Sequence, residues 1–241
     1  MRRAIAAAGS AVMILVCGVS CGGSDTPTPP AASAPVNTPS PSPAAPTKAE
    51  DTAALKKAMV NAADLGKPWV MAKKVATTSN KTDEACPGQP SMVDTVTTVA
   101  SQSRNLTEGK GLGVNIGTFW LSTLPTEDTS EVRAAYAADT KSCRTFKDAN
   151  KLYVVYSLEG PTSAKGADEV LFSRAERLYY DKAHKKLAYA RHTVVVRTGR
   201  VVTYVSYAFL TTKKDPGAED FSRASRLLRI QLAKVASTFS V

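Results

Sequence analysis

The chain has 241 residues, a hydrophobic content of 43% and a formal net charge of +10 at pH 7. This length and composition allow one domain with a sizeable core, and no period of 20 to 50 residues indicates a repeat architecture. The basic charge favours anionic partners, and the export signal described next makes envelope components better candidates than nucleic acid.

The N-terminus has the pattern of an export signal. Two arginines precede an apolar run over 4–19 that is too short for a membrane span. Residues 18–21 (Gly-Val-Ser-Cys) resemble the bacterial lipobox, although Gly18 stands where that box usually has leucine. We therefore expect 1–20 to be a signal peptide and Cys21 to carry the diacylglycerol and palmitate of a lipoprotein. The alternative is a signal peptide without lipidation.

A proline-rich segment follows Cys21. Eight of the fourteen prolines lie in 22–50, and most other residues there are Ala, Ser and Thr. Such a segment buries too little surface to offset its ordering entropy, and it favours extended conformations. We expect 21–50 to be a lipidated cysteine with a disordered tether, and 51–241 to be one globular domain outside the cytoplasmic membrane.

Two cysteines, Cys86 and Cys143, belong to the domain. In an oxidising compartment such a pair is most simply a disulfide. Closing that loop is worth about 4 kcal/mol in the chain-entropy model.

The periodicity of apolar residues predicts helices and strands along the domain. Apolar spacing of three and four residues indicates helices, and runs of β-branched and aromatic residues indicate strands. Thr126 is the expected cap of the middle helix. The predicted helices are 51–65, 126–140 and 218–239, and the predicted strands are 93–106, 113–123, 151–158, 170–180, 187–197 and 200–211. Short connections between strands predict an α+β fold, an antiparallel sheet of about six strands with flanking helices.

The hairpin over 187–211 is the best-defined element, with its two-residue turn expected at 198–199. One face of the hairpin is apolar, and the other mixes valine, tyrosine and arginine. A mixed face is typical of a sheet that is open to solvent, a ligand or a partner. We expect an anionic or glycan ligand there, with contacts from Trp120, Tyr189, Arg191, Arg197 and Tyr204.

No motif of a specific enzyme or cofactor site occurs. HExxH, CxxC and GxSxG are absent, and the glycines over 109–113 lie between two predicted strands and not before a helix. Cys143, His192 and Arg197 are the residue types that sortases use. Sortases, however, place the histidine before the cysteine, and their Thr-Leu-x-Thr-Cys motif is absent. We expect no enzyme, no cofactor and no metal site; a cell-wall thiol enzyme is the last alternative.

Five short sequence motifs occur in an order that is similar to that of a known protein family. They are Ala-Ala-Asp-Leu-Gly-Lys-Pro-Trp at 62–69, Cys-Pro-Gly at 86–88, Cys143 after a helix, Gly-Ala-Asp-Glu at 166–169, and Val-Val-Val-Arg-Thr-Gly-Arg-Val-Val at 194–202. This order resembles actinobacterial lipoproteins related to the extracellular sensor domain of PknH-type kinases. The resemblance implies an antiparallel sheet flanked by helices, with a cleft for an unknown ligand. Those domains carry two disulfides, whereas this domain can form one, and no kinase domain is present. A PsbP-like α/β/α sandwich is the alternative fold.

The sequence therefore predicts a lipid-anchored, non-enzymatic binding or sensing module at the outer face of the cytoplasmic membrane. Its expected partners are the membrane, through the lipid anchor, and an anionic or glycan envelope ligand or an envelope protein. Nucleic acid is not an expected partner. A structural or interaction lipoprotein that pairs with another envelope protein is the first alternative.

Overall fold

The computed structural model describes residues 46–72, 96–109, 115–142, 145–147, 151–157, 160–209 and 221–239. The chain divides into two compact units, Met1–Pro43 and Ala44–Val241, and every described residue lies in the second. The predicted signal peptide, the lipidation at Cys21, most of the tether and the Cys86–Cys143 disulfide lie outside the described residues and stay predictions.

The described residues form helices and strands in the following order: α1 (Lys48–Ala58), α2 (Ala62–Leu65), β1 (Trp69–Met71), β2 (Ala100–Glu108), β3 (Asn115–Thr123), α4 (Ser130–Ser142), β4 (Thr145–Lys147), β5 (Tyr153–Ser157), β6 (Glu169–Tyr179), β7 (Leu187–Thr198), β8 (Val201–Phe209) and α5 (Ser222–Phe239).

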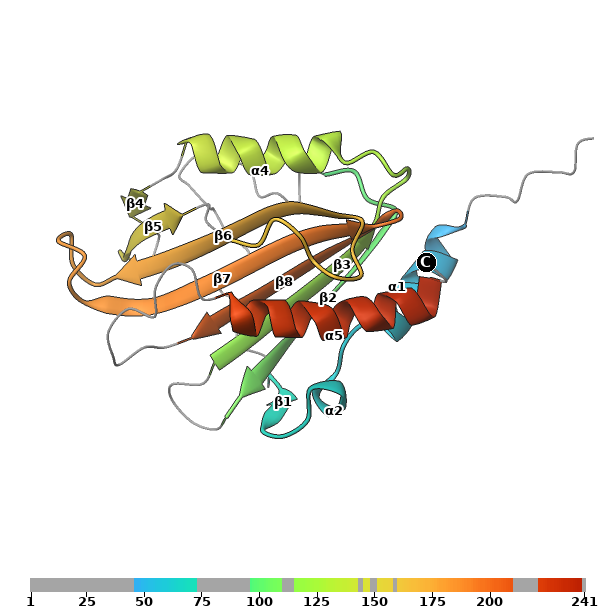
Figure 1. Cartoon of the computed structure of the whole chain (residues 1–241), viewed down its shortest axis with the longest axis horizontal. Coiled ribbons are helices and arrows are strands. Elements are labelled where there is room, and N and C mark those ends of the chain that lie inside the picture. Colours follow the sequence, from blue (N-terminus) through green and yellow to red (C-terminus); the bar gives the residue numbers. More distant parts are fainter. Residues whose placement is uncertain are drawn as a thin grey trace, which may run out of the picture. The chain divides into compact units, whose positions relative to one another are not determined.

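The strands form one antiparallel sheet in the order β1-β2-β3-β8-β7-β6-β5-β4 (Figure 1). This sheet confirms the predicted α+β class. The strand number is eight and not about six, because β1 and β4 were not predicted. Each has only three residues, too few to produce a recognisable alternation of apolar and polar side chains.

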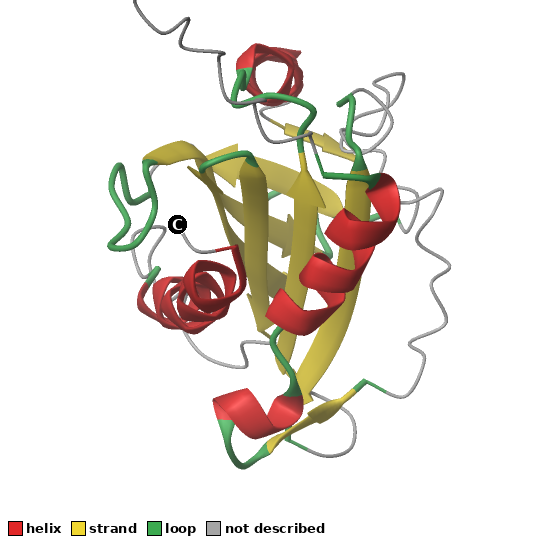
Figure 2. Ribbon diagram, turned by 90° about the vertical axis from the view of Figure 1, so that its right-hand side faces the viewer, coloured by secondary structure: helices red, strands yellow, loops and turns green. Residues whose placement is uncertain are grey.

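Helices cover both faces of the sheet (Figure 2). On the first face, α1 and α5 pack over the main core, which includes Phe119, Leu121 and Val205. We call this the α5 face. On the opposite face, which we call the α4 face, Val132 and Tyr136 of α4 belong to one apolar cluster with strand residues. Both predicted folds, the sheet with flanking helices and the α/β/α sandwich, share this layer order.

The β7–β8 hairpin differs from its prediction by one residue. Thr198 pairs with Val201, so the turn residues are Gly199 and Arg200. Moving the turn by one residue moves the strand pairing by two, which leaves the strand side chains on the faces predicted for them. Gly199 has a φ of +53°, which a glycine adopts without steric cost and which suits the first position of a type II′ turn.

The helix predicted at 51–65 begins earlier than predicted and is divided into two helices. Thr47 and Glu50 form a capping box, so α1 begins at Lys48, inside the segment assigned to the tether. The buried side chain of Gln231 in α5 accepts a hydrogen bond from the Val60 amide (3.1 Å) and donates one to the Ala58 carbonyl (2.8 Å). Gln231 thus satisfies the backbone where α1 ends, and α2 begins after Asn61.

The predicted cap of the middle helix was wrong. Thr126 Oγ1 accepts a hydrogen bond from the Asp128 amide (3.2 Å) in the turn that precedes the helix. The α4 helix begins only at Ser130. Thr126 therefore closes a local turn, a role that threonine also favours.

Candidate ligand-binding site

The five residues predicted to bind a ligand lie on the α4 face. The side chains of a strand alternate between faces, and Tyr204 packs on the α4-face cluster. Tyr204 pairs with Trp120, and residues 189, 191 and 197 share the alternation of Val195, which belongs to the same cluster. The structure thus brings Trp120 and Tyr204 side by side. The guanidinium of Arg191 lies 5.9 Å from the ring of Tyr189.

Arg197 lies at the turn end of β7, away from Tyr189 and Arg191 at the other end of the strand. Its guanidinium lies 3.4 Å from Asp168 Oδ2 and 3.6 Å from Glu127 Oε2 and Glu169 Oε2. It also donates a hydrogen bond of 3.0 Å to the Gly199 carbonyl. Six residues of strand separate Arg197 from Arg191, which is roughly 20 Å. The predicted five residues therefore do not converge on one point.

Two arginines of the strands on the α4 face, Arg174 and Arg191, are bound to a buried carboxylate. Glu176 forms ion pairs with Arg174 and, at 3.5 Å, with Arg191. Arg174 also lies with its guanidinium 4.1 Å from the centre of the Tyr156 ring. Burial raises the pKa of Glu176, but the charges of Arg174 and Arg191 and the hydrogen bond from Arg174 outweigh it, so the pKa is lowered. The charges of this network are therefore directed at one another.

β7 separates two residues of the proposed thiol-enzyme set. His192 is buried on the α5 face, where its ring stacks on Phe221 with centroids 4.6 Å apart. Arg197 lies on the α4 face, because it is five positions, an odd number, beyond His192 in the strand. Cys143 lies outside the described residues. A single catalytic site that contains both His192 and Arg197 is therefore incompatible with this strand.

A pocket of about 370 Å³ lies at the margin of the α5 face, between α2, β1 and the start of α5. We call it the α5 pocket. Its size is within the range of sites for small ligands. It is lined by Leu65, Trp69, Glu108, Tyr207, Ser222, Arg223, Arg226, Leu227 and Ile230.

The wall of the α5 pocket that lies on the sheet is aromatic. Trp69 lies opposite Glu108 in the β1–β2 pairing, and its ring covers Gly117. A Cβ added at Gly117 would lie 3.1 Å from the Trp69 ring, so the glycine is what lets the indole lie so close to the sheet. The ring centroids of Trp69 and Tyr207 are 6.4 Å apart.

A polar network adjoins this wall. The hydroxyl of Tyr207 donates a hydrogen bond of 2.8 Å to Glu108 Oε2, and Asn115 Nδ2 donates one of 3.1 Å to the same oxygen. Arg223 lies 3.1 Å from Glu108 Oε2 and from the Tyr207 hydroxyl. Burial, together with the hydrogen bond to Glu108 and its negative charge, raises the pKa of Tyr207 well above its ordinary value. Tyr207 therefore stays protonated, and its hydroxyl remains a hydrogen-bond donor.

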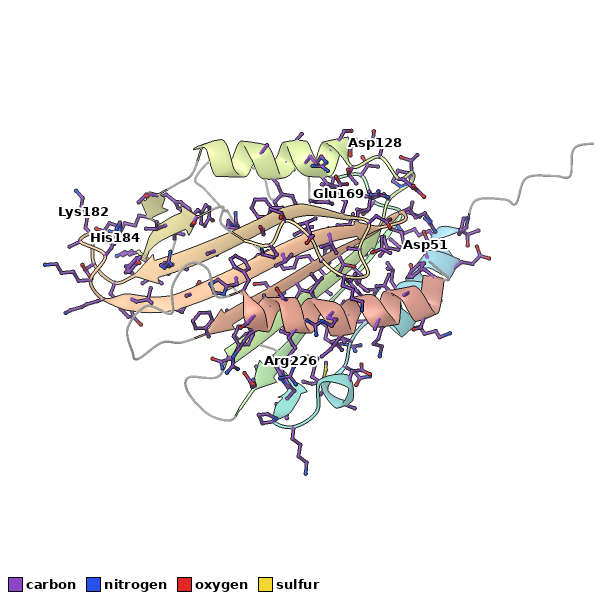
Figure 3. All side chains as sticks on the ribbon, in the orientation of Figure 1. Asp51, Asp128, Glu169, Lys182, His184 and Arg226 are labelled. Carbon is purple, nitrogen blue, oxygen red and sulfur yellow. The ribbon has the colours of Figure 1, made fainter. Side chains whose placement is uncertain are left out.

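Arg226 completes the α5 pocket one helical turn beyond Arg223. Its side chain is exposed on α5 beside the pocket (Figure 3). Within the part of the chain that the structure describes, Arg226 has no hydrogen-bond or ion-pair partner. A cation at a pocket without an internal counter-ion can bind an anionic group of a ligand.

A second pocket, of about 420 Å³, lies on the α4 face between α4 and β6. Arg133 at this pocket is ion-paired with Glu169, and Tyr136 is stacked on Phe172 with centroids 4.3 Å apart. The arginine of this pocket is thus ion-paired, whereas Arg226 of the α5 pocket has no partner among the described residues, so the α5 pocket is the better candidate.

Neither a metal site nor a membrane-spanning helix occurs among the described residues. No three His, Cys, Asp or Glu side chains among them are placed to hold a metal ion. None of the helices in the described ranges is both long enough and apolar enough to cross a bilayer.

Sequence reasoning missed the α5 pocket. The candidate site residues predicted from the sequence included neither Trp69 nor Arg223 and Arg226 of the closing helix. One signal was present: the two arginines are three residues apart, so they lie on the same side of a helix. The partners Trp69, Glu108 and Tyr207 come from three other elements, and no local pattern connects them.

Comparison with known proteins gives similarity in structure only. No protein-family model matches the chain, and no curated protein matches its sequence. The extracellular domain of PknH from Mycobacterium tuberculosis is 12% identical over 57% of this chain and 64% of that one, with a TM-score of 0.37. An Rv0999 ortholog from Mycobacterium smegmatis is 15% identical over 56% of this chain and 64% of that one, with a TM-score of 0.31. The chain thus covers less than two thirds of either structure, and this similarity assigns no site or activity.

Proposed function

We propose that the protein is a lipid-anchored, non-enzymatic binding module outside the cytoplasmic membrane, and that its ligand occupies the α5 pocket. The observation that carries the proposal is the exposed guanidinium of Arg226 beside an aromatic wall and a hydrogen-bonding network in one pocket. The anchor and the location rest on the export signal and the lipobox pattern at Cys21.

The chemistry of the α5 pocket favours a sugar that carries a carboxylate. The indole of Trp69 offers an apolar face for a sugar ring. Glu108 and the Tyr207 hydroxyl can exchange hydrogen bonds with ring hydroxyls. Arg226 can form a charge-assisted hydrogen bond with the carboxylate. The proposed ligand belongs to the class that the sequence predicted, an anionic or glycan ligand. Its proposed site is the α5 pocket and not the mixed face of the 187–211 hairpin.

Isothermal titration of the full chain with glucuronate, and with glucose as the neutral match, tests the proposal. We expect glucuronate to bind more tightly than glucose, and Arg226→Gln to weaken glucuronate binding about tenfold, the usual effect of losing one charge-assisted hydrogen bond. Arg229→Gln is the matched control, because Arg229 is exposed on the same helix but does not line the pocket. Equal loss in both variants, or no difference between the two sugars, would refute the proposed ligand class.

The edge of the sheet favours a second candidate function, partnership with another envelope protein. β1 is the edge strand beside β2, and its Val70 and Met71 side chains are 43% and 54% exposed. An exposed apolar edge strand can accept a strand from a partner. Under this function Val70→Lys would abolish association with the partner, while glucuronate binding would be absent from the unchanged chain.

Intact-mass analysis of the membrane-extracted protein tests the anchor separately. We expect a diacylated N-terminus at Cys21 and a Cys86–Cys143 bond that yields two reactive thiols only after reduction. An unmodified mature N-terminus would remove the anchor from the proposal without affecting the α5 pocket.

A further inference from the structure

One end of the sheet collects lysines from two hairpins. β4 and β5 pair Lys147 with Tyr153, and β5 and β6 pair Tyr153 with Tyr179. The turn that follows β6 carries Lys182 and His184 (Figure 3). We call the exposed lysines at this end the lysine tip; they are Lys147, Lys151, Lys182, Lys185 and Lys186.

Contacts between the two turns show that the lysines share one surface. The His184 ring lies 4.9 Å from the ring of Tyr179 and 6.5 Å from that of Tyr153. The ammonium of Lys147 lies 5.2 Å from the centre of the Tyr153 ring. Residues more than thirty positions apart in the chain therefore form a single basic and aromatic end of the sheet.

The charges of the lysine tip are mostly not balanced among the described residues, where Asp181 interacts electrostatically with one of the five lysines, Lys186. Among the described residues, none of the five lysines forms an ion pair. The acid in the turn is Asp181, and its carboxylate accepts hydrogen bonds from the backbone amides of Lys185 (3.2 Å) and Lys186 (2.6 Å). Asp181 thus shapes the turn that presents the lysines. The Tyr180 side chain beside it is 67% exposed.

The lysine tip lies far from the start of the domain. β7 has twelve residues, which span roughly 40 Å between the turn at 180–186 and the turn at 199–200. At the second turn, Arg200 pairs with Asp51 of α1, the first helix of the domain. The two ends are also opposite in Figure 1. The tip is therefore at the end of the sheet opposite to the end that contacts α1.

We propose that the lysine tip is a docking surface for a linear phosphodiester polymer outside the cell membrane, such as a poly(alditol phosphate). Lysine ammoniums are point charges, so they bind phosphates without the fixed fork geometry that arginine uses for carboxylates and phosphates. A row of lysines therefore suits the repeated phosphates of a flexible polymer. Several neighbouring cations displace counter-ions from a polyanion. The affinity therefore increases with the number of lysines and decreases as the salt concentration rises. Tyr180 supplies an apolar contact for the carbon chain between phosphates.

Retention of the full chain on immobilised poly(glycerol phosphate) tests this docking surface. Cys21→Ser in every variant prevents acylation from contributing. We expect the triple change Lys182→Gln, Lys185→Gln and Lys186→Gln to weaken binding at least about tenfold at physiological salt. The matched control is Lys48→Gln, Lys56→Gln and Lys57→Gln, three exposed lysines on α1 with the same loss of charge; this control should bind within about twofold of the unchanged chain.

Equal weakening in the two triple variants would show that net charge alone acts, and would overturn the docking surface. Absence of binding by the unchanged chain would overturn it as well. Phosphatidylglycerol vesicles and duplex DNA serve as competitors: stronger binding to either one would overturn the polymer as the partner. Glucuronate binding in the α5 pocket is measured on the same variants, so failure of this surface and failure of the proposed function are distinguishable.

Discussion

The two faces of the sheet use their charged residues differently. On the α4 face, Arg174 and Arg191 share the buried Glu176, and Arg197 lies among carboxylates. On the α5 face, the exposed Arg226 lies beside a pocket and has no partner among the described residues. Arginines and aromatic residues are thus present on both faces. Their pairing within the fold, and not their number, separates a structural network from a surface that can bind a ligand.

The largest expected effect concerns the main core on the α5 face. Phe119 is fully buried there, so Phe119→Ala should cost about 3–5 kcal/mol of unfolding free energy, as large-to-small changes in cores do. Val195→Ala in the smaller cluster of the α4 face should cost about 2 kcal/mol. Urea denaturation measures both. If Val195→Ala lowered the free energy of unfolding as much as Phe119→Ala or more, the expected order of the two effects would be wrong.

Glu176 is the next most sensitive position, because it is the shared anion of the buried network. Glu176→Gln would leave two guanidiniums beside a neutral amide, with an expected loss of about 3 kcal/mol. Glu127→Gln, an exposed change of the same type that loses only an ion pair of 3.6 Å with Arg197, should alter stability by less than about 1 kcal/mol. Should Glu176→Gln prove neutral, the network would not hold the α4 face together.

The same residue predicts a dependence of stability on pH. Although burial raises the pKa of Glu176, the charges of Arg174 and Arg191 lower it overall in the folded chain. A lowered folded pKa stabilises the fold above the unfolded pKa of about 4.3, and this stabilisation is lost as the pH falls through the folded value. Melting curves between about pH 7 and pH 3 should therefore be flatter for Glu176→Gln than for the unchanged chain. Parallel curves would contradict this reasoning.

The smallest expected effect on stability is in the α5 pocket. Tyr207→Phe removes the hydroxyl that donates to Glu108 and should cost about 1 kcal/mol of stability. Glucuronate affinity should fall severalfold, because the polar network loses a donor. Tyr204→Phe on the α4 face is the matched control and should leave that affinity unchanged. A larger effect of Tyr204→Phe on affinity would return the site to the face that the sequence predicted.

Most of the fold could be predicted because its elements carry local signals. The alternation along 187–211 assigned the strand residues to the correct faces even though the turn was displaced by one residue. The division between α1 and α2 could not be predicted, because it depends on Gln231, which is more than 170 positions away. Likewise β1 and β4 are too short to show a period, and their pairing with neighbouring strands defines them.

The candidate site was harder to predict than the fold. The alternation of residues along the strands placed Trp120, Tyr204 and Arg191 on one face. It could not show that Arg191 forms an ion pair with Glu176. The sequence also gives no sign that Trp69 and Arg226 line one pocket, because only the tertiary packing of β1 and α5 places them close together. A sequence shows which residue types lie on a strand. The residues that form ion pairs with them come from distant segments and cannot be identified in the same way.

Fluorescence of two single-tryptophan variants tests the location of the ligand most directly. Trp69 lines the α5 pocket and Trp120 lies on the α4 face, and the chain has no other tryptophan. With glucuronate, we predict a saturable change in the emission of Trp69 in the Trp120→Phe variant, and no change in the emission of Trp120 in the Trp69→Phe variant. A saturable response from Trp120 together with a silent Trp69 would contradict the α5 pocket and place the ligand on the α4 face.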